Sequence, residues 1–367
     1  MKSWIIAALL TLATLEVGMA VLSKLEIIKC PEPVYSNRNT GRFWANISQE
    51  FGVWHQPYSS YTHKKSCFNV TYVANSYGAR DVEREYFSDQ ERVVVLGDSF
   101  VEGYGVDSGD RITNLLEKDT GIPHLNFGTS GGFGTTAEML LYQTLASRFS
   151  HNSVMIGMLP NNDFLDDDIG FGKQAYAKQY KPYLDGEYPN YRLVYYRPIL
   201  PDPHDAKISP IKLRLREFSY AYNAVEYLTD LYAQINRIKS LSSSGHIIYS
   251  GYYDYTTDQF QKLRFAIESI LATTMVDGVN VYLFSIPVHG DFFRYKENKL
   301  QTPPLSQELE ALSKDLGFQY VDLLPLMYSE NDDWKKYYLS CDGHWNAYGN
   351  RYAKELLMKA FSLYSVK

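Results

Sequence analysis

Short apolar runs alternate with longer amphipathic stretches from about residue 91 to the end of the chain. Five runs have the length and β-branched character of buried strands: residues 92–96, 122–127, 152–159, 279–286 and 319–323. Between and after them, the pattern indicates helices at 111–118, 135–149, 256–276, 304–316 and 346–361. Because alternating strands and helices form a parallel sheet covered on both faces, residues 91–367 predict an α/β fold. We expect a three-layer α/β/α sandwich around a five-stranded parallel sheet.

An insertion interrupts this alternation after the third strand, at residues 164–250. It holds three adjacent aspartates, a Pro- and Tyr-rich stretch and a helical pattern at 216–240, whose apolar stripe is Phe218, Ala221, Val225, Leu228, Tyr232 and Ile235. We expect this stripe to pack against the domain; a helix that faces a partner or a membrane is the alternative. Insertions of this length often form a lid or part of a substrate wall.

The first 25 residues are a targeting segment. Residues 4–22 are mostly apolar and close to the length of about 20 residues that spans a bilayer, although Glu16 interrupts them. A small-x-small pattern, Gly18-Met19-Ala20, follows a positively charged start, as in a signal sequence. We interpret the segment as an export signal, with an uncleaved anchor as the alternative. The rest of the chain is then exported to the periplasmic or extracellular side, and the membrane is an expected partner.

Residues 26–90 form an irregular lead-in rather than an independent core. The three cysteines, Cys30, Cys67 and Cys341, lack the short paired spacing of zinc or redox sites, and no metal site is expected from the histidines. Cys30 and Cys67 could pair in an oxidising compartment, or both could remain free thiols.

Polar segments follow four of the predicted strands. Ser99 follows the first strand, 126–134 the second, 160–164 the third and 341–346 the fifth. Since ligands of open parallel sheets bind beyond the carboxyl ends of the strands, these segments are expected to meet at one rim.

The residue types at this rim suit acyl transfer. Ser99 is a candidate nucleophile, His344 the base that takes its proton, and Asp342 the group that orients His344. The backbone N–H groups of Ser99 and Gly131 and the side-chain amide of Asn162 are candidate oxyanion donors.

Four further residues are candidates for supporting or lining the site. Asp98 and Asp163 are expected to support their turns by accepting backbone hydrogen bonds. His289 follows the fourth strand and competes with His344 for the rim; we favour His344 because an aspartate lies beside it. His289 and Trp345 are candidate pocket residues.

Charge and composition limit the classes of molecule that this protein is expected to bind. The formal net charge of −6 and pI near 5.8 exclude a basic nucleic-acid footprint. The 32 tyrosines are compatible with ordinary packing or with a sugar-stacking surface. The sequence does not indicate an oligomeric state.

Four sequence blocks resemble the SGNH, or GDSL, hydrolase family in the family's order. They are Gly97-Asp98-Ser99, Asn126-x-Gly128-x-Ser130-Gly131, Asn162-Asp163 and Asp342-Gly343-His344-Trp345-Asn346. The resemblance covers about 91–365 and implies a flavodoxin-like domain with a serine nucleophile and no cofactor. The segments 73–81 and 181–189 resemble an exported branch associated with surface polysaccharides.

Two positions depart from the family pattern. Asp342 and His344 are two residues apart instead of three, a spacing that resembles that of alginate O-acetyltransferase-like proteins. Proline stands at 160, where the third block of the family usually has glycine.

The sequence therefore predicts an esterase or O-acyltransferase that acts on acyl, in particular acetyl, esters of an extracytoplasmic carbohydrate. A lipid esterase and a catalytically silent polysaccharide-binding protein are the alternatives. A dinucleotide site at 131–137, which reads G-x-G-x-x-A, is disfavoured because it follows the second strand and no strand-end acid lies about 20 residues on.

Overall fold

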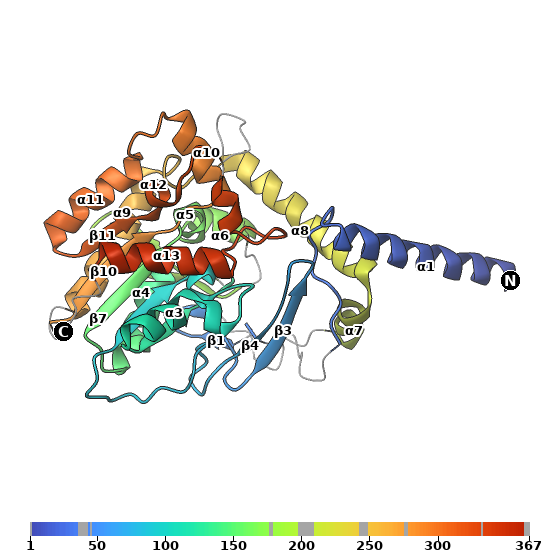
Figure 1. Cartoon of the computed structure of the whole chain (residues 1–367), viewed down its shortest axis with the longest axis horizontal. Coiled ribbons are helices and arrows are strands. Elements are labelled where there is room, and N and C mark those ends of the chain that lie inside the picture. Colours follow the sequence, from blue (N-terminus) through green and yellow to red (C-terminus); the bar gives the residue numbers. More distant parts are fainter. Residues whose placement is uncertain are drawn as a thin grey trace.

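The structure is a computed structural model that describes residues 2–35, 43–44, 46–175, 179–196, 209–241, 249–274, 278–331 and 333–362. A parallel sheet with the strand order β11-β10-β7-β5-β6 forms its centre (Figure 1). The strands are β5 (Val93–Gly97), β6 (His124–Gly128), β7 (Ser153–Met158), β10 (Asn280–Ser285) and β11 (Gln319–Asp322). Each starts and ends close to its predicted run, so the predicted five-stranded sheet is confirmed.

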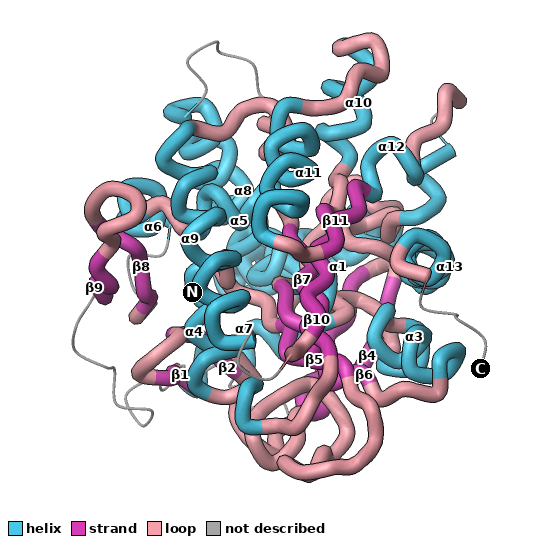
Figure 2. Tube along the Cα trace, turned by 90° about the vertical axis from the view of Figure 1, so that its left-hand side faces the viewer, coloured by secondary structure: helices cyan, strands magenta, loops and turns pink. Residues whose placement is uncertain are grey.

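Helices cover both faces of the sheet. On one face α3 (Ile112–Thr120) packs against α13 (Ala347–Ala360), and on the other α4 (Thr135–Thr144) packs against α9 (Thr257–Thr274) (Figure 2). Every residue of β5 and β6 is buried, as expected for strands covered on both sides. The three-layer sandwich is thus confirmed. The other helices of this part are α2 (Ser99–Glu102), α5 (Pro160–Asp166), α10 (His289–Glu297), α11 (Pro304–Leu316) and α12 (Leu323–Met327).

The lead-in forms two β-hairpins that pack on the domain. They pair β1 (Asn46–Ser48) with β2 (Gly52–Trp54), and β3 (Ser60–Lys65) with β4 (Phe68–Val73). Alternate residues of β4 are buried, because one face of its hairpin covers a small apolar cluster. That cluster consists of Phe43, Phe68, Val70, Tyr72, Ala74, Leu339 and Cys341. The lead-in is therefore packed against the loop that precedes α13.

A disulfide bond joins the same two regions. Cys67, in the turn between β3 and β4, is bonded to Cys341 across 274 residues of sequence, and Cys30 is a buried free thiol. Pairing of Cys30 with Cys67 is therefore wrong. The true partner lies next to Cys67 only because the β3–β4 hairpin folds onto the C-terminal loop, a contact that cysteine spacing does not reveal.

The insertion contains α6 (Ile169–Ala175), β8 (Lys181–Asp185), β9 (Arg192–Tyr196), α7 (Pro210–Phe218) and α8 (Tyr220–Leu241). The expectation that the apolar stripe of α8 packs on the core is wrong. Val225, Leu228 and Tyr232 are exposed, whereas Asn223, on the opposite side of the helix, is buried. Helical spacing identifies residues that share a face, but it does not say what that face contacts.

The N-terminal helix α1 (Lys2–Lys24) extends away from the domain (Figure 1). The C-terminal part of α1 packs against α8. Within the described part of the chain, α1 is the one helix long and apolar enough to cross a membrane, with a mean hydropathy of 2.2.

Candidate active site

The turn after β5 places Ser99 at the rim of the sheet. Ser99 is the first residue of α2, and Asp98 caps this helix by accepting a hydrogen bond from the N–H of Phe100 (2.9 Å). The helix lies directly on the strand ends, because a Cβ on Gly128, at the end of β6, would be 2.3 Å from the backbone nitrogen of Glu102. Glycine at this position therefore allows α2 to approach the sheet closely.

Ser99, His344 and Asp342 form one chain of hydrogen bonds. Ser99 Oγ is 2.7 Å from His344 Nε2, and His344 Nδ1 is 2.5 Å from Asp342 Oδ1. The backbone N–H of His344 also donates to Asp342 Oδ1, at 3.2 Å. The two-residue spacing thus lets one carboxylate oxygen accept from both the ring and the backbone of the same histidine.

Lys65, at the end of β3, forms an ion pair with the other oxygen of Asp342. The side chains of Lys65 and Asp342 are only 10% and 12% exposed, so water screens this pair weakly. Burial alone would raise the pKa of Asp342, but the hydrogen bond and charge of His344, together with Lys65, hold it well below its usual range. Asp342 is therefore ionised throughout the neutral pH range. No sequence signal pointed to Lys65, because the disulfide and the hairpin bring it to the site.

Aromatic rings fix the position of the His344 imidazole. Tyr104 stacks on it with ring centroids 4.2 Å apart, and Phe100 lies 4.9 Å away. Trp345 packs edge-on against Phe100 and is 2% exposed, so it lies in the core beneath the site.

The ring of His289, at the start of α10, lies against Trp334 and Tyr338, at centroid distances of 5.1 and 4.4 Å. The structure thus brings His344, rather than His289, to Ser99.

The three candidate oxyanion donors come from the three segments that follow β5, β6 and β7. The backbone N–H of Ser99 is in the first turn of a helix, where it has no partner within the helix. Gly131 has a φ of +111°, a conformation that favours glycine, in the loop between β6 and α4. Asn162 lies in the first turn of α5, close enough to Asp98 for its side chain to favour the charged form of that residue. The loop after β6 is tied to this rim, since Thr129 N–H donates to Gly97 O at 3.2 Å.

A buried glutamate at the end of α2 holds the Gly131 loop in place. Glu102 accepts hydrogen bonds from the hydroxyl of Ser130, from His55 Nε2 (3.1 Å) and from Trp44 Nε1 (3.0 Å). Burial opposes its ionisation, but the hydrogen bond and charge of His55, with Arg80, lower the pKa of Glu102. The sequence analysis missed this network, since His55 and Trp44 belong to the lead-in and no motif marks them.

Buried carboxyl groups lie beneath the rim. Asp163 Oδ2 accepts a hydrogen bond from Leu159 N–H at 2.8 Å, so this residue, like Asp98, accepts a backbone hydrogen bond in its turn. Burial raises the pKa of Asp98 to about 6 and that of Asp167 to about 6. Burial and the neighbouring carboxylates raise the pKa of Glu138 and Asp163 well above the usual range. Among the described residues, no three His, Cys, Asp or Glu side chains are arranged to hold a metal ion.

No family model matches the chain, and no curated protein sequence matches it. Solved structures that it resembles include a GDSL-like lipase from Bacteroides thetaiotaomicron (14% identity, 76% of this chain and 92% of that one, TM-score 0.39). A member of the lipolytic protein G-D-S-L family from Veillonella parvula gives 12% identity, 74% and 98% coverage and a TM-score of 0.37. A lipase/acylhydrolase from Enterococcus faecalis is 12% identical, with 73% of this chain and 94% of that one covered and a TM-score of 0.37. Similarities of this size carry no conclusion about the family, substrate or reaction of this chain.

Proposed function

We propose that this protein is a serine-dependent ester hydrolase or O-acyltransferase that acts on acyl esters, in particular acetyl esters, of a carbohydrate outside the cytoplasm. The observation that carries the proposal is the hydrogen-bonded chain from Ser99 Oγ through His344 to Asp342. A serine hydroxyl becomes a nucleophile when a histidine within hydrogen-bond distance accepts its proton. Because Asp342 binds Nδ1–H, His344 presents Nε2 as the acceptor to Ser99.

The first half of the reaction acylates Ser99. Its Oγ attacks the acyl carbon while its proton moves to His344 Nε2, and the former carbonyl oxygen becomes an oxyanion. The N–H groups of Ser99 and Gly131 and the amide of Asn162 stabilise that charge; losing one such donor typically costs about 2.7–4 kcal/mol. The intermediate collapses when the leaving alkoxide takes the proton from His344.

The second half releases the acyl group. His344 accepts a proton from an incoming hydroxyl, whose oxygen attacks the acyl carbon, and returns it to Ser99 as the ester bond to the enzyme breaks. Water as acceptor gives hydrolysis, and a sugar hydroxyl gives acyl transfer. Neither route consumes a cofactor.

A lipid ester is a second candidate substrate, because the segment that follows α1 touches the loop before Asp342. Lys29 Nζ donates to Ser340 O (2.7 Å), and the hydroxyl of Ser340 donates to Glu26 (3.0 Å). If α1 remains as a membrane anchor, the catalytic loop lies close to the bilayer surface.

The test is hydrolysis of p-nitrophenyl acetate by the full chain in detergent micelles. Ser99→Ala and His344→Ala are expected to abolish turnover, and Ser147→Ala, a change at a surface serine, should leave it unchanged. Release of acetate from an acetylated glycan, and of no fatty acid from phospholipid, would support the carbohydrate assignment, and the reverse would favour the lipid ester. A folded wild type that hydrolyses no ester and binds glycan as well as Ser99→Ala does would contradict the enzymatic proposal.

A further inference from the structure

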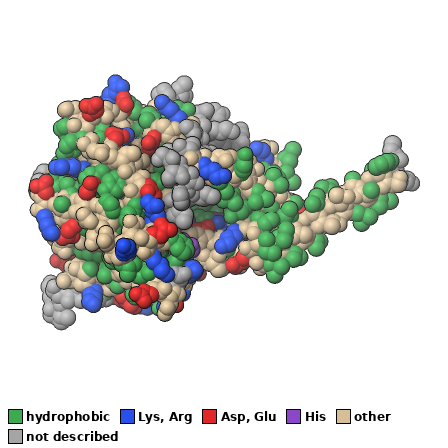
Figure 3. All heavy atoms as spheres, turned by 90° about the horizontal axis from the view of Figure 1, so that it is seen from above, with side chains coloured by type: hydrophobic (Ala, Val, Ile, Leu, Met, Phe, Trp, Pro, Cys, Tyr) green, Lys and Arg blue, Asp and Glu red, His purple; other side chains and the backbone are tan. Residues whose placement is uncertain are grey.

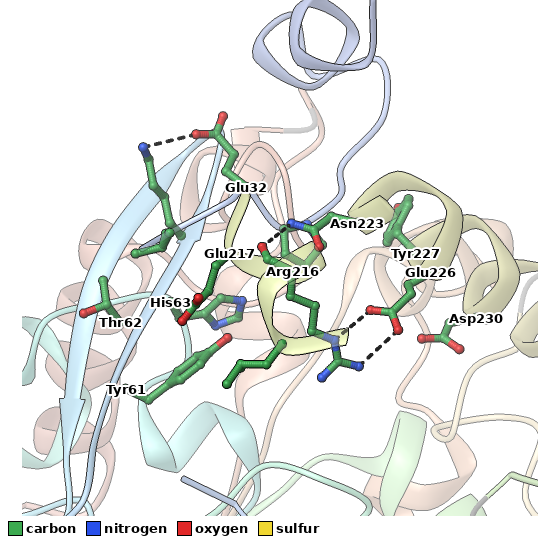
Figure 4. A pocket seen from close by; sticks show the side chains of 14 residues that line it. Glu32, Tyr61, Thr62, His63, Arg216, Glu217, Asn223, Glu226, Tyr227 and Asp230 are labelled. Carbon is green, nitrogen blue, oxygen red and sulfur yellow. Dashed lines mark hydrogen bonds and ion pairs between the residues drawn. The ribbon is translucent and has the colours of Figure 1, made fainter. Parts of the chain in front are cut away.

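Helices α7 and α8 turn polar side chains inward and apolar side chains outward. A pocket of 280 Å³ lies between β3 and these helices (Figure 4). The helices line it mostly with charged and polar residues, namely Arg216, Glu217, Asn223, Glu226 and Asp230. A surface helix of a soluble domain normally has the opposite arrangement, with its apolar stripe toward the core.

The outward side of the pair is apolar and accessible. Six residues, which we call the outer face, are between 40% and 72% exposed: Ile211, Leu215, Phe218, Val225, Leu228 and Tyr232. Ile211, Leu215 and Phe218 are spaced by four and three residues and so lie on one side of α7. Apolar side chains gather where the body of the molecule meets the long N-terminal helix (Figure 3).

Basic residues flank this face. In α7, Lys212 and Arg214 lie beside the side defined by Ile211 and Leu215, and both are exposed. The acidic residue of α7, Glu217, is buried, lines the pocket and forms an ion pair with Arg214 at 2.7 Å. An apolar face with lysine and arginine at its edges is typical of helices that lie in a membrane interface, where the cations reach the lipid head groups.

Glu16 fixes α1 against this pair of helices. Its carboxylate accepts a hydrogen bond from the hydroxyl of Ser219 and from the backbone N–H groups of Tyr220 (2.9 Å) and Ala221 (3.4 Å). The charge that interrupts the apolar N-terminal segment therefore binds the N-terminus of α8, where backbone N–H groups favour an anion. Cleavage after Ala20 would remove this contact.

We propose that α1 is retained as a membrane anchor. We also propose that the outer face inserts into the lipid leaflet nearest the domain, which is the leaflet that α1 also crosses. Leu22 lies six residues after Glu16 in α1, which is a rise of about 9 Å along the helix. If the apolar segment spans the bilayer up to Leu22, the α7–α8 corner, which contacts Glu16, lies about 9 Å inside the membrane boundary. This depth matches the roughly 5–10 Å to which interfacial helices insert. This proposal goes beyond the reaction assigned to Ser99 and does not depend on it.

The experiment uses the full chain reconstituted in vesicles of phosphatidylethanolamine and phosphatidylglycerol. The fluorophore NBD is attached to a cysteine introduced as Leu228→Cys, and Tyr232→Cys provides a second position on the outer face. The native cysteines are disulfide-bonded or buried and do not compete for the label. Phe87→Cys is the matched control, because Phe87 is 83% exposed and precedes Ser88, whose N–H donates to Ser150 at the amino end of the central strand β7, away from the rim.

Nitroxide-labelled lipids are expected to quench NBD several-fold at positions 228 and 232 and to leave it unchanged at 87. Equal, weak quenching at all three positions would show that the outer face is in water and would overturn the proposal. Blue-shifted but unquenched emission at 228 and 232 would also overturn it, since protein, such as a second copy of the chain, would then cover the face. An intact Cys67–Cys341 disulfide and an unchanged circular dichroism spectrum verify that each labelled variant is folded.

Discussion

Replacing Asp342 by asparagine removes the negative charge beside His344 and keeps the shape of the side chain. The carboxylate accepts hydrogen bonds from the ring and the backbone of His344 and pairs with Lys65. An asparagine oxygen can still accept from Nδ1, so the variant tests the charge more than the position of the imidazole. We expect a large fall in kcat with little change in KM, because Asp342 contacts His344 rather than the substrate.

The size of the effect follows from the geometry. Asp342 Oδ1 lies 2.5 Å from His344 Nδ1, and the aspartate side chain is only 12% exposed. For unit charges about 4 Å apart at an effective dielectric constant of about 20, the attraction is about 4 kcal/mol. His344 is positively charged only after it has taken the proton of Ser99, so the attraction stabilises the transition state more than the ground state. Since Lys65 opposes part of this attraction, we expect kcat to fall about 10²- to 10³-fold.

Steady-state hydrolysis of p-nitrophenyl acetate measures both constants. Asp119→Asn is the control, since it removes a carboxylate from a surface ion pair with Lys354 at the end of α3. It should change neither constant. If folded Asp342→Asn keeps more than a tenth of the wild-type kcat, Asp342 does not support the imidazole in the way described.

Three other changes test the surroundings of the site. Replacing Cys67 and Cys341 by serine should lower the free energy of unfolding in urea by up to about 5 kcal/mol, because the bond closes a loop of 274 residues; an unchanged midpoint would contradict this. Ser130→Ala should lower kcat about tenfold, because it removes the hydrogen bond to Glu102 that holds the Gly131 loop. If a variant of Ser130 that keeps this hydrogen bond loses kcat to the same extent, the bond does not have that role. Glu138→Gln should become more stable relative to wild type as pH rises above about 4, by up to about 1.4 kcal/mol per pH unit, because buried Glu138 in the folded wild type keeps a proton that the unfolded chain releases; denaturation curves between pH 4 and 8 measure the difference, and parallel curves would refute it.

The fold was predictable because its signals are local. Each strand of the sheet is a short apolar run bounded by glycine or polar residues, and each following helix has its own periodic stripe. The rim was predictable for the same reason, since parallel strands bring their carboxyl ends together. The D-x-H spacing did not show whether Asp342 reaches His344, because that depends on the path of the loop between them.

Contacts between segments that are far apart in the chain could not be predicted from the sequence. Lys65 reaches Asp342 only after the β3–β4 hairpin has folded onto the C-terminal loop, and Cys67 finds Cys341 by the same contact. The apolar stripe of α8 was assigned to the core by the rule for soluble helices. That rule fails here because the polar side of α8 lines the inner pocket and its apolar side points outward.

The most direct test of the central claim is to trap the acyl group on Ser99. The full chain is mixed with p-nitrophenyl acetate, quenched in acid and digested, and the peptides are examined by mass spectrometry. The account predicts one acetyl group on Ser99, removed by hydroxylamine as an ester is, and absent from Ser99→Ala. Turnover by a wild type that carries no acetyl group on Ser99, or equal labelling of the Ser99→Ala protein by a hydroxylamine-sensitive acetyl group, would contradict it.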